Sequence, residues 1–169
     1  GDRVVAADTY SDYPPEVRSR ATINCWPRIP LEEVVALRPD LVLVLTQEGE
    51  ELKRLEAAGV RAAQLFPKTL AETLDCIRLL GRITGTTPTA EELVTEMRQR
   101  VDEVQRRVRG RPRPRVIMEL DATDPARPWV AGGGAIYHEV LRLAGGDNLF
   151  ADQPQPTLQV TAEQIIAAD

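Results

Sequence analysis

The sequence predicts an α/β protein whose two lobes are built on parallel sheets and joined by one long helix. In the first 86 residues, short β-prone runs alternate with helical patterns, an order that is typical of βαβ units in a parallel sheet. One helical pattern at about 89–109 is then long enough to span roughly 30 Å. The alternation starts again after residue 110. These three observations indicate a first lobe at 1–86, a connecting helix at 87–110 and a second lobe at 111–169.

The first lobe is predicted element by element. The run LVLVLT at 41–46 is continuously apolar, as expected of a strand buried on both faces. Gly59 closes a helical pattern, and Thr69 with Glu72 forms a capping box before another helix. The expected order is a strand at 3–7, a helix at 31–37, a strand at 41–46, a helix at 48–59, a strand at 60–66 and a helix at 70–84.

The connecting helix and the second lobe follow from similar patterns. Thr89 and Glu92 predict a second capping box at the start of the long helix. One stripe of this helix carries apolar residues at helical spacing, namely Leu93, Met97, Val101, Val104 and Val108. The second lobe is expected to contain a strand at 115–120, a weaker strand at 129–132, a glycine-rich turn and helix at 132–146, a Pro/Gln loop at 152–160, and a last helix capped by Thr161 and Gln164. From these patterns, neither lobe is expected to have a full set of strands.

The composition of the chain excludes several classes of protein. The formal net charge of −5 predicts no affinity for nucleic acid or for anionic membranes. The only histidine is His138 and the only cysteines are Cys25 and Cys76, too scattered for the roughly three or four ligands of a zinc site. The two cysteines are able to pair or to stay free. No apolar run reaches the length of a transmembrane helix. The chain opens without a methionine, so the lack of a signal peptide does not assign it to the cytoplasm.

No motif for catalysis or phosphate binding is found. The turn GGGAIYHE lacks GK[ST], and the first βα unit lacks GxGxxG; both are the marks of phosphate-binding loops. We interpret this turn as one that approaches a ligand or another backbone closely. The basic run RRVRGRPRPR is interpreted as a solvated connector at a helix C-terminus, and Asp121 and Asp124 as turn-capping residues. The missing motifs argue against a nucleotide-using α/β enzyme, which is the rival interpretation from another class of protein.

Several aromatic residues adjoin prolines in loops and at strand ends. In SDYPPEV, two prolines fix the backbone that follows Tyr13. Trp26 and Trp129 each adjoin a single proline. Rings held in this way suit a site for a large, flat, amphipathic ligand, and ordinary packing at a strand edge is the alternative. Tyr13, Trp26 and Trp129 are therefore the aromatic candidates for ligand binding.

Three segments together resemble a known family. DTYSDYPPEV, PLEEVVALRPDLVLV and GGGAIYHEVLRLAGGDNLFAD occur in this order, and the chain resembles the periplasmic solute-binding proteins of ABC importers. The subgroup is the one in which a single helical backbone joins two Rossmann-like lobes and the ligand is cobalamin, a ferric siderophore or haem. SDYPP is most similar to the cobalamin-binding proteins. The resemblance covers nearly the whole chain, and it implies that family elements precede and follow it.

The resemblance also implies roles for individual residues. Tyr13 and Trp26 match aromatic residues that pack on the corrin ring. Glu32 and Glu163 match two acidic residues, one in each lobe, that dock on arginines of the membrane permease. Two further tryptophans of the cobalamin pattern fall near Leu45 and Leu158 in this chain. The turn that matches the cleft-facing loop of the second lobe consists of Ala131, Gly132, Gly133 and Gly134.

The expected function follows from this resemblance. The chain would be the substrate-binding component of an ABC transporter, which captures cobalamin or a related corrinoid and delivers it to a permease driven by ATPase subunits. No intrinsic cofactor or metal is implied, and the location would be periplasmic, or extracellular with a membrane anchor. A ferric-siderophore or haem receptor is the alternative, and haem would need an axial Tyr, His or Met, for which Tyr10 or Tyr13 would serve. An unpaired sheet edge at 3–7 or 41–46 would also favour a non-native dimer.

Overall fold

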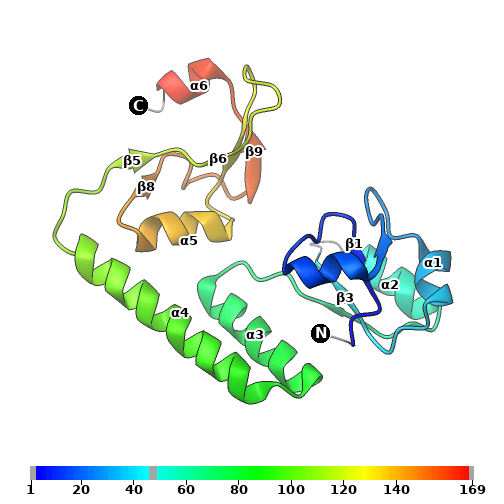
Figure 1. Ribbon diagram of the computed structural model, residues 1–169. Coiled ribbons are helices and arrows are strands. Elements are labelled where there is room, and N and C mark those ends of the chain that lie inside the picture. Colours follow the sequence, from blue (N-terminus) through cyan, green and yellow to red (C-terminus); the bar gives the residue numbers. More distant parts are fainter. Residues whose placement is uncertain (1–2, 46–48, 168–169) are drawn as a thin grey trace. The chain divides into compact units, whose positions relative to one another are not determined.

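The computed structural model describes residues 3–45 and 49–167 of the chain (Figure 1). The structure divides into two compact units, Gly1–Phe66 and Pro67–Asp169, and each unit is treated by itself below. Within the described ranges, no helix combines the length and the apolar character that a membrane span requires.

Over its described residues, the first unit contains two pairs of parallel strands and two short α-helices. Its elements, in order, are β1 (Ala6–Asp8), the 3-10 helix η1 (Pro15–Ser19), β2 (Ala21–Ile23), α1 (Leu31–Ala36), β3 (Val42–Val44), α2 (Glu50–Ala57) and β4 (Ala62–Gln64). β1 pairs with β2, and β3 pairs with β4. Each predicted element of this region is present, and β2 and η1 are additional elements that the sequence patterns did not predict.

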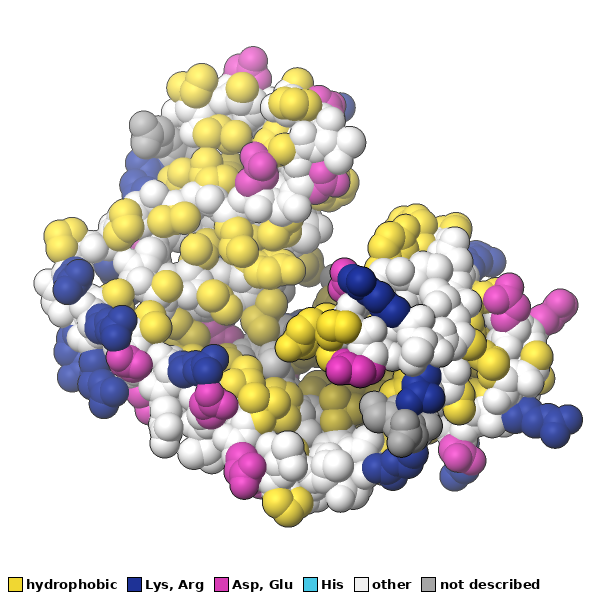
Figure 2. Space-filling model, viewed as in Figure 1, with side chains coloured by type: hydrophobic (Ala, Val, Ile, Leu, Met, Phe, Trp, Pro, Cys, Tyr) yellow, Lys and Arg dark blue, Asp and Glu magenta, His cyan; other side chains and the backbone are white. Residues whose placement is uncertain are grey.

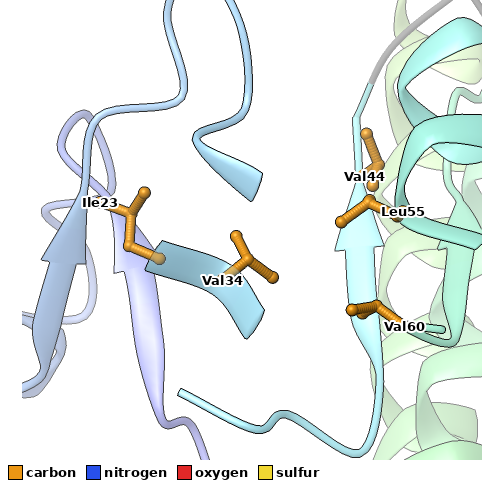
Figure 3. Close-up of a cluster of buried hydrophobic side chains, with 5 residues drawn as sticks. All are labelled: Ile23, Val34, Val44, Leu55 and Val60. Atoms are coloured by element: carbon orange, nitrogen blue, oxygen red, sulfur yellow. The ribbon is translucent and has the colours of Figure 1, made fainter. Parts of the chain in front are cut away.

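The core of the first unit is a cluster of five buried aliphatic side chains. Figure 3 shows that they come from β2, α1, β3, α2 and the turn before β4. The members are Ile23, Val34, Val44, Leu55 and Val60. Since successive side chains of a strand point to opposite faces, the burial of Val44 leaves its neighbours Leu43 and Leu45 exposed. The prediction that the strand at 41–46 is buried on both faces is therefore wrong.

The strand pairs of the first unit also leave edges open. Among the described residues, β1 and β3 each have one strand neighbour, so their backbone polar groups on the other side have no strand partner there. The predicted dimer through such an edge stays a prediction.

The second unit begins with two helices and continues with short strands. Its elements are α3 (Leu70–Thr84), α4 (Thr87–Val108), β5 (Arg115–Val116), β6 (Glu119–Asp121), β7 (Trp129–Ala131), α5 (Ile136–Leu143), β8 (Asp147–Asn148), β9 (Thr157–Gln159) and α6 (Ala162–Ala167). β5 pairs with β8 in parallel, whereas β6, β7 and β9 form an antiparallel sheet. The α/β class, the parallel strand pairs and the long helix are confirmed. The antiparallel sheet was not predicted, and the predicted Pro/Gln loop contains β9.

The start of α3 confirms one predicted cap. Thr69 Oγ1 accepts a hydrogen bond from the backbone N–H of Glu72 at 3.1 Å. The Glu72 carboxylate accepts from the N–H of Lys68, at 2.6 Å, one residue before the cap. The helix ends at Gly85, whose φ of 66° lies in the left-handed region that favours glycine.

The start of α4 differs from the prediction. The helix begins at Thr87, with Pro88 in its first turn, a position that suits proline because its missing N–H would have no partner there. Thr89 lies inside the helix, so the predicted capping box with Glu92 is wrong.

The buried face of α4 also differs in part from the predicted stripe. Ala90 and Val94 are its buried residues, whereas Leu93 and Val104 are exposed. Ala90 lies against Gly81 of α3, where a side chain on the glycine would overlap with it. The close contact between α3 and α4 therefore sets which face of α4 is buried. The compact units group α3 with α4, and the predicted division into two lobes and a connecting helix stays a prediction.

A carboxylate ties α5 to the start of α3. Glu139 Oε2 accepts a hydrogen bond from the backbone N–H of Leu70 at 2.6 Å, across 69 residues of sequence. The first N–H groups of a helix have no partner within the helix, and a negative charge is favourable at that end. Glu139 therefore provides a long-range cap that joins two helices of the second unit.

We expect Glu139→Ala to weaken this junction. The Leu70 N–H is partly buried and would lose its acceptor, which costs about 1–2 kcal/mol. Hydrogen exchange followed by mass spectrometry should then show faster exchange in the first turn of α3. Glu139→Gln is the matched control, because the amide keeps an oxygen acceptor and should retain most of the protection. Equal exchange in the parent and in both variants would contradict this role.

Candidate functional site

The carboxylate of Asp8 joins the two loops that follow β1 and β2. Asp8 Oδ1 accepts a hydrogen bond from the backbone N–H of Tyr10 at 2.8 Å, and Oδ2 accepts from the N–H of Cys25 at 3.1 Å. The bond from Tyr10 is the largest cause that holds the pKa of Asp8 below its ordinary value; partial burial opposes it and the bond from Cys25 adds to it. Both loops leave the carboxyl ends of parallel strands, which is where open α/β sheets bind ligands.

Backbone contacts fix the same loops further. The N–H of Thr9 donates to the carbonyl of Ile23 at 3.0 Å, so the strand pairing continues by one residue. The N–H of Trp26 donates to the Asn24 side-chain oxygen at 3.1 Å. The loops are thus held by hydrogen bonds at the point where each carries an aromatic residue.

Two exposed aromatic rings border a hollow between these loops. The hollow has a volume of about 350 Å³ and is lined by Asp8, Tyr10, Cys25 and Trp26. Tyr10 is 77% exposed and Trp26 is 73% exposed. Large rings left open to solvent beside a hollow are a feature of binding sites, because aromatic side chains there offer apolar area and a polar edge.

The thiol of Cys25 contributes to the hollow as a neutral group. Its side chain packs against the core of the first unit. Burial, followed by the hydrogen bond with Asp8, raises the pKa of Cys25 to about 11. The thiolate is the nucleophilic and metal-binding form of cysteine, and little of it is present at neutral pH. Cys25 and Cys76 are both free thiols in this structure.

Of the two aromatic residues predicted in the first unit, only one lines the hollow. Trp26 lines the hollow, whereas Tyr13 is 85% exposed and does not line it. Tyr13–Pro14 and Trp26–Pro27 are both cis peptide bonds. Tyr10 does line the hollow; from the sequence it was expected only as an axial ligand for the haem alternative and not among the residues that contact a corrinoid. The sequence signal that would have found it is an aspartate at a strand end followed two residues later by a tyrosine, since such an aspartate often accepts from that backbone N–H.

The predicted turn of the second unit lies at the end of β7. Trp129 is 42% exposed, and Ala131 is fully buried. The N–H of Gly132 donates to the carbonyl of Pro156 at 3.1 Å, and the N–H of Gly133 donates to the carbonyl of Gln153 at 2.7 Å. The turn is therefore bonded along its backbone to the segment that leads into β9.

The three glycines of this turn are explained by that contact. A Cβ on Gly132, Gly133 or Gly134 would overlap with backbone carbonyl groups of the facing segment, at Gln155, Ala151 and Pro154 respectively. The sequence left open whether the turn approaches a ligand or another backbone, and within the second unit it approaches another backbone. Ligand binding by Ala131 and the three glycines stays a prediction.

Both predicted docking acids lie at helix starts. Glu32 is in the first turn of α1 and Glu163 in the first turn of α6, and both are exposed. A hydrogen bond from the Thr161 hydroxyl, followed by one from its own backbone N–H, lowers the pKa of Glu163. Thr161 and Gln164 form the predicted reciprocal cap of this helix, with distances of 2.8 and 3.3 Å. The docking role of the two acids stays a prediction.

The remaining residues that could carry chemistry are two aspartates in turns and the single histidine. Asp121 Oδ1 accepts from the N–H of Thr123 at 2.7 Å, and Asp124 Oδ1 accepts from the N–H of Ala126 at 3.0 Å, as predicted for turn-capping residues. His138 lies in α5, and its Nδ1 is buried without a hydrogen bond. Over residues 3–45 and 49–167, no group of three or more His, Cys, Asp or Glu side chains is placed to hold a metal ion.

Arginines of the basic run at 106–115 form ion pairs and hydrogen bonds within the second unit. Along α4, cationic and anionic side chains are interspersed on the surface (Figure 2), and Arg107 pairs with Glu103 one turn earlier. Beyond the helix, Arg113 Nε donates to Asp147 Oδ1 at 2.8 Å, and Arg113 Nη2 donates to the carbonyl of Gly146 at 2.9 Å. These contacts agree with a solvated helix end and connector.

A hollow at the carboxyl ends of parallel strands is typical of ligand-binding α/β proteins. Comparison with known proteins identifies the family to which the chain belongs. The family model of the periplasmic binding proteins matches residues 1–169, so the chain belongs to this family. The resemblance seen in the sequence is thereby confirmed. The family is periplasmic, and it is a class of binding proteins.

Relatives within the family are named for a ligand. The chain is 31% identical to a vitamin B12-binding protein of Photorhabdus laumondii, over 98% of this chain and 60% of the relative. The structure is similar to that of the periplasmic vitamin B12-binding protein of Vibrio cholerae, with a TM-score of 0.86, 28% identity, and coverage of 99% and 66%. It is also similar to a periplasmic haem-binding protein of Pseudomonas aeruginosa, with a TM-score of 0.81, 26% identity, and coverage of 98% and 61%. The chain thus spans about 60% of the length of the curated relatives it matches.

We expect Gly133→Ala to destabilise the second unit. The added Cβ would meet the backbone carbonyl of Ala151, which cannot move aside as a flexible side chain would, and overpacking of this kind costs about 1–3 kcal/mol. The free energy of unfolding, measured in urea through Trp129 fluorescence in a Trp26→Phe background, should fall. Gly49→Ala is the control, because a Cβ there meets no atom within 4 Å. A Gly133→Ala variant as stable as this control would show that the turn does not need glycine for packing.

Proposed function

We propose that this chain is part of the substrate-binding component of an ABC importer and captures cobalamin or a related corrinoid. The observation that carries the proposal is the hollow beside Tyr10 and Trp26 at the carboxyl ends of β1 and β2. Exposed rings at such an edge offer a flat, apolar surface with polar groups beside it, which suits a large macrocycle. The similarity to vitamin B12-binding proteins supports this choice of ligand. The chain acts by binding and carries out no catalysis.

A haem or ferric-siderophore receptor is the second candidate. The similarity to a haem-binding protein and the phenol of Tyr10 in the lining of the hollow favour haem, since tyrosine is an axial ligand of haem iron. Incubation of the protein with cobalamin, haemin or a ferric siderophore, followed by gel filtration and an absorption spectrum, separates the candidates. Co-elution of haemin but not of cobalamin would transfer the proposal to haem.

Delivery to a membrane permease completes the proposed function. The ligand would pass to a permease whose ATPase subunits supply the energy, and the receptor would act in the periplasm or at the outer face of a membrane to which it is anchored. Glu32 and Glu163 are the proposed docking residues, because both match the acidic docking positions of the family that the chain resembles and both carboxylates are exposed. Exposed charges of this kind mainly steer association and fix orientation.

The first prediction of this proposal concerns stacking. In the protein that carries this chain, Tyr13→Ala and Trp26→Ala should each weaken cobalamin binding measured by calorimetry, because an aromatic contact contributes on the order of 1 kcal/mol beyond its area. Tyr137→Ala is the control, as it removes a partly exposed tyrosine of α5 that is not a predicted ligand contact. If both variants bind cobalamin as tightly as the parent, the aromatic assignment is incorrect.

The second prediction concerns docking. The double variant Glu32→Arg with Glu163→Arg should keep ligand affinity and Tm near the parent values. Permease binding and uptake into reconstituted vesicles should fall about tenfold or more, because like charges would face each other at the interface. The parent complex should weaken as salt rises.

A neighbouring acid provides the control for docking. Glu33 is also exposed in the first turn of α1, so Glu33→Arg makes the same charge change at nearly the same place. It should reduce uptake much less than Glu32→Arg. An equal loss would mean that only the overall charge matters, and normal uptake by the double variant would leave both residues as helix-start acids.

A further inference from the structure

Asp8 is the charged member of the four residues that line the hollow of the first unit. Its two oxygens each accept one backbone N–H bond, and the Cys25 thiol also interacts with the carboxylate. A carboxylate has room for about four hydrogen bonds. The bonds from the backbone hold the pKa of Asp8 below its ordinary value, so the group is ionised at neutral pH. Asp8 therefore retains both a full negative charge and spare capacity to accept hydrogen bonds.

The other lining groups carry no positive charge that would offset this one. Tyr10 and Trp26 are neutral aromatic residues, and the thiol of Cys25 is protonated because its pKa is raised to about 11. A ligand group that enters the hollow meets aromatic surface and one carboxylate. A neutral group with N–H donors, such as a primary amide, can donate to that carboxylate. A ligand carboxylate would be repelled by it, as like charges are when they face each other in an interface.

The size of the hollow limits what it can hold. The hollow is wide open to solvent, and its volume of about 350 Å³ is near the lower end of the roughly 300–1,000 Å³ that is usual for sites of small ligands. A macrocycle packed on Trp26 would therefore place one edge, with its peripheral substituents, in the hollow.

We propose that Asp8 makes this hollow a selectivity subsite, which accepts the amide-bearing edge of a flat macrocycle and disfavours a carboxylate-bearing edge. The inference rests on the proposed function and assigns the choice between its ligand classes to one residue. The periphery of a corrinoid such as cobalamin carries amides, whereas haem carries two carboxylates. The same carboxylate positions the loops of Tyr10 and Cys25, so its role in selectivity has to be separated from its role in positioning.

Two corrinoids of one ring system separate the two roles. Dicyanocobinamide carries amides at its periphery, and dicyanocobyrinic acid carries carboxylates there. Calorimetry on the protein that carries this chain should show tighter binding of cobinamide. Asp8→Asn should reduce the ratio of the two affinities by about tenfold or more, since it removes the facing like charge. If Asp8→Asn only disturbed the position of the loops, it would weaken the binding of both corrinoids by the same factor. The ratio of their affinities would then be unchanged.

Asp12→Asn is the matched control. Asp12 lies in the loop that follows β1, as Tyr10 does, and its side chain is 77% exposed. Its Oδ2 is 4.0 Å from Nη2 of Arg18. It does not line the hollow, and its substitution makes the same change in net charge. The affinity ratio should stay near the parent value.

The outcomes distinguish this inference from the proposed function. If the parent binds both corrinoids and Asp8→Asn leaves the ratio unchanged, the selectivity role is overturned while corrinoid binding stands. An equal fall of the ratio in Asp12→Asn would assign the preference to overall charge and would also overturn it. If the parent binds neither corrinoid, the proposed function itself fails and the inference fails with it.

Discussion

The carboxylate of Asp8 is the constraint on which the candidate site of the first unit depends. β1 and β2 are only three residues long, and their pairing alone does not determine the course of the loops beyond them. One side chain accepts the N–H of Tyr10 and the N–H of Cys25, so both loops are fixed from a single point at the end of β1. The rings of Tyr10 and Trp26 can then stay exposed beside a hollow while the backbone beneath them is held. A site that is formed before the ligand arrives loses less conformational freedom on binding.

The second unit holds its strand ends by a different means. Its glycine turn packs backbone against backbone, with Gly132 and Gly133 bonded to the segment before β9. The three glycines are needed there because the Cβ of any other residue would overlap with the facing carbonyl groups. Glu139 adds a long-range bond from α5 to the start of α3. Local backbone contacts thus shape the edge of the sheet, while a carboxylate joins the helices.

The sequence predicted the helices better than the strands, for physical reasons that particular residues show. Thr69 and Gly85 mark the ends of α3 with signals that lie within a few residues of the helix itself, and its predicted bounds are those observed. β2 consists of Ala21, Thr22 and Ile23, too short for a period to be visible, and it exists because it pairs with β1. β9 is similar, since its pairing with β7 outweighs the loop-like composition of its surroundings. The stripe on α4 was predicted only in part, because the small side chain of Ala90 meets Gly81 and turns that face inward.

The sequence by itself determined the α/β class, the long helix, the acidic charge and the family resemblance, because these depend on local patterns and on motifs in a fixed order. It also indicated Trp26 as a candidate, through its neighbouring proline, and Trp26 lines the hollow. Only the tertiary structure decided that Tyr10 lines the hollow and that Asp8 holds both loops. It likewise decided that the glycine turn meets the backbone of its own unit. These facts depend on contacts between residues distant in sequence, such as Asp8 with Cys25 and Gly133 with Gln153. No local pattern encodes such a contact, because it forms only when separate elements are brought together by packing.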